Sequence, residues 1–426
     1  MSETNEEYSD YRPEHGNHQN SRNDSILYKS NIQYDSLAGN AFSNSKTPMT
    51  TIITDPALLV GNSLKLSGYI KLLKTAALVG AVKFNGSAYS LIKQIQIYYG
   101  GTPFVNLTQY VKYLAQFRRN ITKSHTEYEQ SSLTGLEGQD LNATPGARYN
   151  FELDLDIFGL VKKFMPTSDL AKMEIKIVFE SELGELFNCA VNTAGQTVTG
   201  HEISDCYINA DTITYKGSIH QKIMNEFRSA KGVEMASHSF QCSSQDLVAN
   251  TLSHNLRASA NFMNLTNGYV IPIPQTVVTN ASGCSPVDIV ATATYANKDY
   301  PSNEIIKLGN NGRPVQPGSF VGASKKLTHY NGVLSNASAT SKHSNVAAQL
   351  TKLYKTDDYQ CTSGSWVKGL LNDERILNNG ENTYPANGLV LVSFNTASNQ
   401  AGKSALVVFE YTSIIKVSQG QIMLIE

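Results

Sequence analysis

This chain has little charge and no long apolar run, and each shortage excludes a class of protein. Charged residues make up 17% of its 426 residues, and the formal net charge is -1. No global field would steer it to nucleic acid or to an acidic membrane surface, so we expect no sequence-specific contact with nucleic acid. The longest apolar stretch, residues 75–82, is far too short to cross a bilayer, and no charged-then-apolar leader opens the sequence. We therefore expect synthesis and retention in the cytosol.

Residues that carry chemistry are also sparse or scattered. The five cysteines are odd in number and include no Cys-x-x-Cys pair, so we interpret them as reduced thiols. They are Cys189, Cys206, Cys242, Cys284 and Cys361. The nine histidines are scattered, with His15 and His18 in a polar N-terminal stretch, which argues against a structural zinc site. No Gly-x-Ser-x-Gly elbow and no local cysteine signature indicates a nucleophile.

Residues 1–25 lack apolar periodicity and are biased toward acids, so they cannot bury enough surface to offset the entropy of ordering. Their charged residues are Glu3, Glu6, Glu7, Asp10, Glu14 and Asp24 against Arg12 and Arg22. We predict a flexible arm over residues 1–48, with a protein partner rather than nucleic acid because the arm is not basic. Its aromatic and apolar contacts would be Tyr8, Tyr11, Ile26 and Tyr28. A merely solvated tail is the alternative.

From Met49 onward the dominant signal is a period of two, which predicts short β-strands bounded by turn residues. In the first half the predicted strands are Lys93–Tyr99, Tyr149–Leu155 and Met173–Phe179. In the second half they are Tyr269–Ile273, Val287–Tyr295, Leu389–Phe394, Ala405–Tyr411 and Gln421–Ile425. The run Tyr98–Pro103 predicts a reverse turn that closes a hairpin.

Three short helices are predicted among these strands. Apolar residues four apart mark a helical stripe in Ser218–Ala230, where we place the junction between two domains. The others are Gln109–Phe117 and Asn345–Tyr354. The predicted domains are residues 49–222 and 223–426, the second with a long loop excursion at 297–385. Dense strands without alternating helices favour an all-β fold of sandwiches or jelly rolls.

One motif would satisfy a search for nucleotide-binding loops. Residues Ala397–Ser404 (ASNQAGKS) match a relaxed Walker A pattern with Ala in place of the first Gly. A phosphate loop needs a helix directly after its Lys-Ser, so that backbone N–H groups face the phosphates. Here a predicted strand, Ala405–Tyr411, follows instead, and too little chain remains for a magnesium-binding carboxylate strand. We interpret the motif as a hairpin loop.

A row of carboxylates is the second candidate for chemistry. Glu152, Asp154 and Asp156 alternate with Phe151, Leu153 and Leu155, and could form a carboxylate pair or a divalent-ion site. Strict alternation gives the same row on any solvated strand, and no histidine or further acid accompanies it at coordinating spacing. We therefore nominate no catalytic, cofactor-binding or metal-ligating residue, and we expect no enzyme activity.

The order of elements resembles that of the double jelly-roll major capsid proteins of tailless bacteriophages, adenovirus, virophages and Polinton-like elements. The segments that carry the resemblance are Ser90–Gly100, Phe104–Leu107 with the helix to Phe117, Arg148–Asp156, and Phe164–Thr167 with Leu170–Phe179. The likeness spans most of Met49–Glu426, and it is one of architecture and texture without a diagnostic motif.

The resemblance implies two eight-stranded jelly rolls in one chain. Three chains would make a pseudo-hexagonal capsomer, and capsomers would tile an icosahedral shell, so the partners would be copies of the chain and minor capsid or penton proteins. The chain would be made in the host cytoplasm and end in the virion. The excursion at 297–385 would form an outer tower and the arm would brace neighbouring capsomers. The sequence leaves open whether a membrane lies beneath the shell.

Two other functions compete with this one. In a β-sandwich viral spike or carbohydrate-binding protein, loop aromatic residues would stack on sugar rings. These are Tyr295, Tyr300, Tyr330, Tyr359 and Trp366, the only tryptophan. A β-sandwich glycosidase would require two carboxylates converging across a cleft, and the acidic residues show no such concentration.

Overall fold

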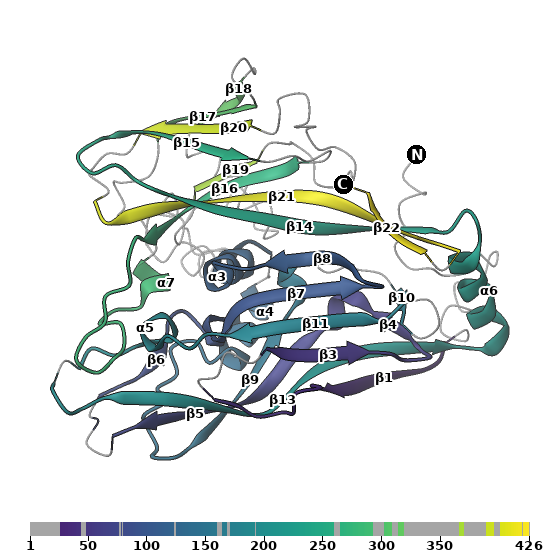
Figure 1. Cartoon of the computed structure of the whole chain (residues 1–426), viewed down its shortest axis with the longest axis horizontal. Coiled ribbons are helices and arrows are strands. Elements are labelled where there is room, and N and C mark those ends of the chain that lie inside the picture. Colours follow the sequence, from purple (N-terminus) through teal and green to yellow (C-terminus); the bar gives the residue numbers. More distant parts are fainter. Residues whose placement is uncertain are drawn as a thin grey trace, which may run out of the picture.

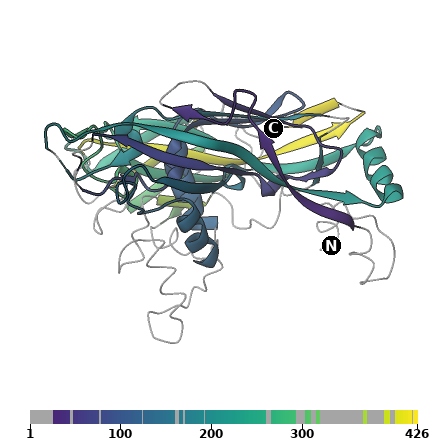
Figure 2. The same cartoon turned by 90° about the horizontal axis from the view of Figure 1, so that it is seen from below.

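The computed structural model describes residues 26–425 except for short gaps and two long ones. The gaps are residues 44–47, 76–77, 79, 123–124, 160–163, 168–170, 192, 260–264, 293–301, 309–313, 319–365, 370–388, 396–400 and 420. The strands of both halves run along the long axis of the molecule (Figures 1 and 2).

Two facing sheets build the first half. Its strands are β1 (Ile26–Asp35), β2 (Phe42–Ser43), β3 (Met49–Ile53), β4 (Leu58–Val60), β5 (Lys65–Lys74), β6 (Lys83–Phe84), β7 (Ile92–Tyr99), β8 (Thr102–Leu107), β9 (Arg148–Asp154), β10 (Phe164–Pro166), β11 (Met173–Phe179), β12 (Phe187–Asn188) and β13 (Val198–Tyr215). One sheet runs β1, β13, β5, β9, with β4 and β10 continuing the lines of β5 and β9, and β2 beside β13. The other sheet runs β3, β11, β7, β8, and β6 pairs with β12 in a small ribbon.

Two sheets also build the second half. Its strands are β14 (Val233–Asp246), β15 (Ser253–Ser259), β16 (Leu265–Pro274), β17 (Ser302–Leu308), β18 (Pro314–Gly318), β19 (Trp366–Gly369), β20 (Leu389–Asn395), β21 (Lys403–Ser418) and β22 (Gln421–Ile425). One sheet runs β14, β21, β16, β19, with β22 beside the end of β21, and the other runs β15, β20, β17, β18.

The two halves have the same topology. For this comparison, β4 and β5 are counted as one interrupted strand, and β9 and β10 as another. In each half, the first, last, third and sixth long strands then lie side by side in one sheet, in that order. The second, seventh, fourth and fifth strands form the other sheet. This order is that of an eight-stranded jelly roll. The predicted all-β fold with two consecutive jelly rolls is confirmed.

Alternating apolar residues account for the strands of the first half. Along β11, Met173, Ile175, Ile177 and Phe179 are buried while the residues between them are half-buried, so one face packs on the core. The predicted hairpin turn is confirmed between β7 and β8, where Gly100 and Gly101 have φ of 55° and 83°. Only glycine adopts such angles without strain.

Helices fill the connections rather than build the sheets. They are α3 (Val111–Thr122), α4 (His125–Thr134), α5 (Leu183–Leu186), α6 (Gly217–Arg228) and α7 (Ile289–Thr292). Two predicted helices are confirmed, since α3 overlaps Gln109–Phe117 and α6 overlaps Ser218–Ala230. The helix α6 joins β13 to β14, the last strand of one jelly roll to the first strand of the other (Figure 1). None of the helices among the described residues has the length and apolar character to span a membrane.

Three expectations, about the arm, one strand and the long excursion, need correction. Ile26–Asp35, assigned to the flexible arm, forms β1 and pairs with β13 from Ile26↔Tyr215 to Asp35↔Tyr207. The apolar alternation of this strand is weak, because its least exposed residues, Ser30, Ile32 and Tyr34, are only half-buried and one of them is polar. Val287–Tyr295 is not a strand, because Ile289–Thr292 forms α7. The excursion at 297–385 is not wholly loop, because it contains β17, β18 and β19.

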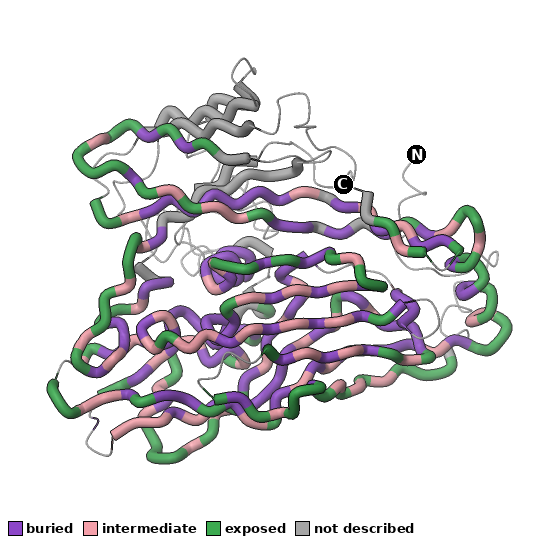
Figure 3. Tube along the Cα trace, in the orientation of Figure 1, coloured by how far each residue is buried: buried purple, intermediate pink, exposed green. Residues whose placement is uncertain are grey.

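The predicted helix Asn345–Tyr354 lies outside the described residues. The remaining predicted strands are confirmed within β7, β9, β11, β16, β20, β21 and β22, with bounds shifted by a few residues. Figure 3 shows buried positions along the strands of the first half and along β14 and β21, where the two halves meet.

Candidate functional site

Besides the two cores, the described residues form an extensive interface between the two jelly rolls, here called the seam. The sheet of β14 and β21 lies between the second half's other sheet and the first half (Figure 1). Residues Ser404–Glu410 of β21 are buried without interruption, so both faces of this strand are covered. Leu406 and Val408, on one face, belong to the same buried cluster as the core of the first jelly roll. The seam is therefore a continuous apolar junction.

A buried ion pair crosses the seam. Arg118 of α3 donates from Nη1 to Oε1 of Glu410 on β21 at 3.1 Å, and both side chains are almost fully buried. The guanidinium of Arg118 also lies 4.8 Å from the ring centroid of Phe240 on β14. Removing one member of such a pair leaves an uncompensated buried charge, which costs about 3–5 kcal/mol. The pair thus fixes the position of α3 against the second jelly roll.

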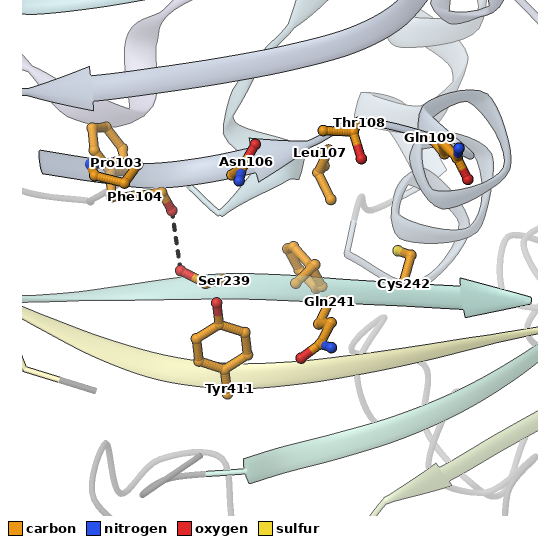
Figure 4. A pocket seen from close by; sticks show the side chains of 11 residues that line it. Pro103, Phe104, Asn106, Leu107, Thr108, Gln109, Ser239, Gln241, Cys242 and Tyr411 are labelled. Atoms are coloured by element: carbon orange, nitrogen blue, oxygen red, sulfur yellow. Dashed lines mark hydrogen bonds between the residues drawn. The ribbon is translucent and has the colours of Figure 1, made fainter. Parts of the chain in front are cut away.

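Beside this pair, a groove of about 340 Å³ separates the edge strands β8 and β14 (Figure 4). Its floor includes the buried Phe104, Leu107 and Phe240, and polar side chains such as Gln109 and Gln241 line its rim. At one end the strands are tied directly, because Ser239 Oγ donates to the carbonyl oxygen of Phe104 at 3.1 Å. The groove contains no cluster of catalytic groups.

A second connection comes from residues 277–290, which follow β16 and include the first two residues of α7. They are here called the clasp. Although it belongs to the second jelly roll, it hydrogen-bonds to the first. Cys189 N donates to Ser285 O at 2.8 Å, Ser285 N to Phe187 O at 3.0 Å, and Val198 N to Ser282 O at 3.0 Å. The clasp thereby forms a parallel bridge at Asn188↔Ser285, beside the ribbon of β6 and β12.

Side chains and glycines complete the clasp. Gly86 N donates to Asp288 Oδ1 at 3.0 Å, and Ile289 N donates to Asn85 Oδ1 at 3.2 Å. A Cβ on Gly86 would lie 3.0 Å from Val290, so glycine lets the clasp approach closely. Ser282, Cys284 and Ser285 are buried there. Buried polar groups that are all paired in this way favour one fixed arrangement of the two jelly rolls.

The helix α3 is itself anchored by a fully buried arginine. Arg119 donates to Ser131, Ser87, Gln116, Ser132 and Glu137 at 3.0 to 3.2 Å. Its guanidinium lies 5.6 Å from the ring centroid of Tyr89. This network ties α3 to α4 and to the first jelly roll, and so it holds Arg118 at the seam.

The Walker-like motif is not a phosphate loop. Lys403 and Ser404 are already in β21, and Ser404 Oγ donates to Asp246 Oδ1 at 2.6 Å. Because β20 and β21 belong to different sheets, the connection is not the predicted hairpin but a link between the two sheets of the second jelly roll. Residues 396–400 lie outside the described part of the chain.

The carboxylate row of β9 is occupied by a lysine from the neighbouring strand. Lys65 Nζ lies 2.6 Å from Glu152 and 3.8 Å from Asp154, and all three side chains are partly exposed. Asp156 lies beyond β9 in a short 3-10 helix. Among the described residues, no group of three or more His, Cys, Asp or Glu side chains could hold a metal ion.

The other residues singled out from the sequence do not converge. Cys189, Cys206 and Cys284 are buried free thiols and Cys242 is half-buried, and burial raises the pKa of Cys206, Cys242 and Cys284 to about 12. Trp366 lies in β19. Outside the described residues lie Cys361, His15, His18, Tyr295, Tyr300, Tyr330 and Tyr359. Sequence reasoning missed the seam, although the unbroken apolar run Ala405–Phe409 signals a strand covered on both faces.

Two jelly rolls of equal topology, joined by a helix and locked along a seam, define the double jelly-roll architecture. The chain is similar to a chain of the PBCV-1 virus capsid, with a TM-score of 0.62 and 11% identity over 97% of this chain and 99% of that one. It is similar to the Faustovirus major capsid protein, with a TM-score of 0.58 and 8% identity over 96% and 92% of the two chains. For a chain of the Sputnik virophage the TM-score is 0.51 and the identity 11%, over 94% and 89%.

These three structures share the fold of this chain over nearly its whole length, which confirms the resemblance at the level of fold. No family model matches the sequence, and no curated protein matches it either.

Proposed function

We propose that this chain is the major capsid protein of an icosahedral virus, with a structural and not an enzymatic role. The observation that carries the proposal is the repetition of one jelly-roll topology in two halves that are locked side by side. Three such chains around a threefold axis present six similar barrels, which is a pseudo-hexagonal unit able to tile a shell. The similarity to the PBCV-1 capsid and the Faustovirus major capsid protein over nearly the full chain supports the same role.

The seam suits this function because a capsomer needs rigid building blocks. If the two barrels of one chain moved independently, the six-barrelled outline would not hold its shape. The ion pair Arg118–Glu410 and the clasp fix the angle between the barrels within the chain. Contacts between chains would then cover the remaining faces, and interfaces of obligate oligomers bury on the order of 2,000 Å² or more.

The proposed domains are a first jelly roll from β1 to β13, a second from β14 to β22, and α6 as the link between them. The partners are further copies of the chain and minor capsid or penton proteins. The protein is made in the host cytoplasm and resides in the virion. Residues 1–25 then brace neighbouring capsomers, and the excursion at 297–385 contributes to an outer tower.

The native mass of the full chain in solution tests the proposal. The capsomer predicts a species of about 140 kDa, three times the 46.6 kDa chain, in mass photometry at nanomolar concentration. Negative-stain images of that species should show hexagonal outlines. A protein that stays monomeric at high concentration, with no ring-shaped particles, would contradict the proposed role.

A deletion of residues 1–25 tests the bracing role of the arm separately from the formation of the capsomer. We expect the trimer to persist and the yield of closed shells to fall. An unchanged shell yield would remove the bracing role from the arm and leave the capsomer untouched. For the tower, protease cleavage of intact particles should fall in residues 297–385, and protection there would contradict an outer position.

A further inference from the structure

The helix α6 presents a basic surface at one end of the molecule. Its apolar residues Ile223, Met224 and Phe227 are buried, so the helix is fixed against the body of the protein. The opposite side and the flanking turns expose Lys216, Lys222, Arg228 and Lys231, with Glu226 as the one exposed acid of residues 216–231. We call these four basic residues the α6 basic surface. It contrasts with the chain as a whole, whose formal net charge is -1.

The start of β1 lies directly beside this surface. Ile26 pairs with Tyr215, the residue before Lys216, so the chain enters the described structure next to the first turn of α6. Leu27, at a register shift of the strand ladder, and Tyr28 follow and are 60% and 52% exposed. Basic and apolar groups are therefore exposed together where residues 1–25 join the fold.

Residues 1–25 have the complementary composition. They contain six acids and two arginines, and five of the acids, Glu3, Glu6, Glu7, Asp10 and Glu14, fall in the first fourteen positions. The same stretch includes two aromatic residues, Tyr8 and Tyr11. At up to about 3.3 Å per residue, a segment of this length can reach any part of α6 from Ile26.

From this complementarity we infer that residues 1–25 bind the α6 basic surface of their own chain. Each exposed ion pair contributes only about 0.2–1 kcal/mol, so no single contact holds the segment. The covalent connection at Ile26 raises the effective concentration to the order of millimolar, which favours the same chain over a neighbour. The segment would cover the positive end of the molecule and compete with any other anionic partner for it. This inference does not depend on the proposed capsid role. It concerns the protein before shells assemble, whereas the bracing role proposed for residues 1–25 applies to the closed shell.

Zero-length carbodiimide cross-linking of the full-length protein tests the inference, because it joins carboxylates only to amines in direct contact. An equal mixture of chains labelled with nitrogen-14 and nitrogen-15 distinguishes links within a chain from links between chains. We expect links from acids of residues 1–14 to Lys216, Lys222 or Lys231, within single chains. Their yield should fall severalfold in 1 M salt, where the Debye length is about 3 Å.

Charge-swapped variants supply the control. Lys222→Glu combined with Lys231→Glu should abolish the links without unfolding the protein, because both side chains are exposed. Adding Glu6→Lys and Glu7→Lys should restore links between the swapped side chains. Lys93 in β7, which pairs with Glu180, should give no links to residues 1–14 in any variant. Links found only between differently labelled chains, or none at α6, would overturn the inference.

Discussion

The last strands of the two jelly rolls occupy the same topological position and differ in burial. Strand β13 alternates, with exposed Glu202, Asp205 and Asp211 between buried residues. Strand β21 is buried without a break from Ser404 to Glu410. Both are central strands between the first and third strands of their own jelly roll, so the difference does not come from topology. It comes from what covers the outer face.

The outer face of β13 meets solvent, whereas the outer face of β21 meets the first jelly roll across the seam. The first jelly roll therefore covers a whole sheet face of the second, whereas the second covers chiefly α3 and the edge strand β8 of the first. We expect the second jelly roll to depend on the first for its stability more than the first depends on it. Isolated sandwiches bury one face of each sheet, and an additional buried face removes more apolar area from water.

The largest expected effect breaks the first jelly roll and leaves the seam residues in place. Arg119→Met removes the buried guanidinium while keeping much of the volume, and it leaves Glu137 and Ser87 without their cationic partner. We expect a loss of about 3–5 kcal/mol in the free energy of unfolding, measured by urea denaturation. Because the second jelly roll depends on the first for its stability, both should unfold at a lower urea concentration.

Lys176→Met is the matched control, since Lys176 forms an exposed pair with Glu174 in the same jelly roll. It should leave the midpoint nearly unchanged. If Arg119→Met shifted only one of two separate transitions, the proposed dependence of the second jelly roll would be wrong.

The next effect breaks the seam itself. Glu410→Gln removes the charge opposite Arg118 and should cost about 2–3 kcal/mol. Arg118→Met leaves the buried carboxylate of Glu410 without the guanidinium and should cost about 3 kcal/mol. The double variant should cost less than the two together by about 1–3 kcal/mol. Denaturation of the three variants completes the cycle. Additive losses would show that the two side chains are not coupled, contrary to their 3.1 Å contact.

A smaller effect loosens the clasp. Asp288→Ala leaves Gly86 N without its acceptor and should cost about 1–2 kcal/mol, with faster protease cleavage in residues 277–290. Asp288→Asn keeps an acceptor oxygen at the same place and should retain most of the stability. Equal cleavage rates for the alanine and asparagine variants would mean that this hydrogen bond does not hold the clasp.

Much of the fold could be predicted because period-two alternation marks strands with one buried face. Strands such as Met173–Phe179 follow this rule closely, and their density indicates an all-β fold. The division into two jelly rolls was implied by the resemblance to the double jelly-roll capsid proteins and not by the alternation. The rule failed where polar residues interrupt it, as in β1, and where an apolar run forms a helical turn, as in Ile289–Thr292. In both segments, tertiary contacts and not the local sequence pattern decide the secondary structure.

The seam could be predicted only in part. A continuous apolar run such as Ala405–Phe409 indicates burial on both faces, but it does not say which partner covers the second face. The pairs Arg118–Glu410 and Gly86–Asp288 join residues 292 and 202 positions apart. No spacing rule in a single sequence connects such residues.

The smallest predicted effect is a dependence of stability on pH, and it again distinguishes the first jelly roll from the second. Burial lowers the pKa of His201 in β13 from 6.5 to about 4, against the opposing influence of Glu180. The unfolded chain therefore binds more protons than the folded one between these values, and stability falls as pH falls through this window. From about pH 7 to about pH 5.5 the loss should be about 1 kcal/mol. His201→Gln should flatten this dependence, which denaturation at both pH values would measure.

His254→Gln, in β15 of the second jelly roll, should leave the pH dependence due to His201 intact. An equally steep dependence in the His201 variant would assign the acid sensitivity to other groups.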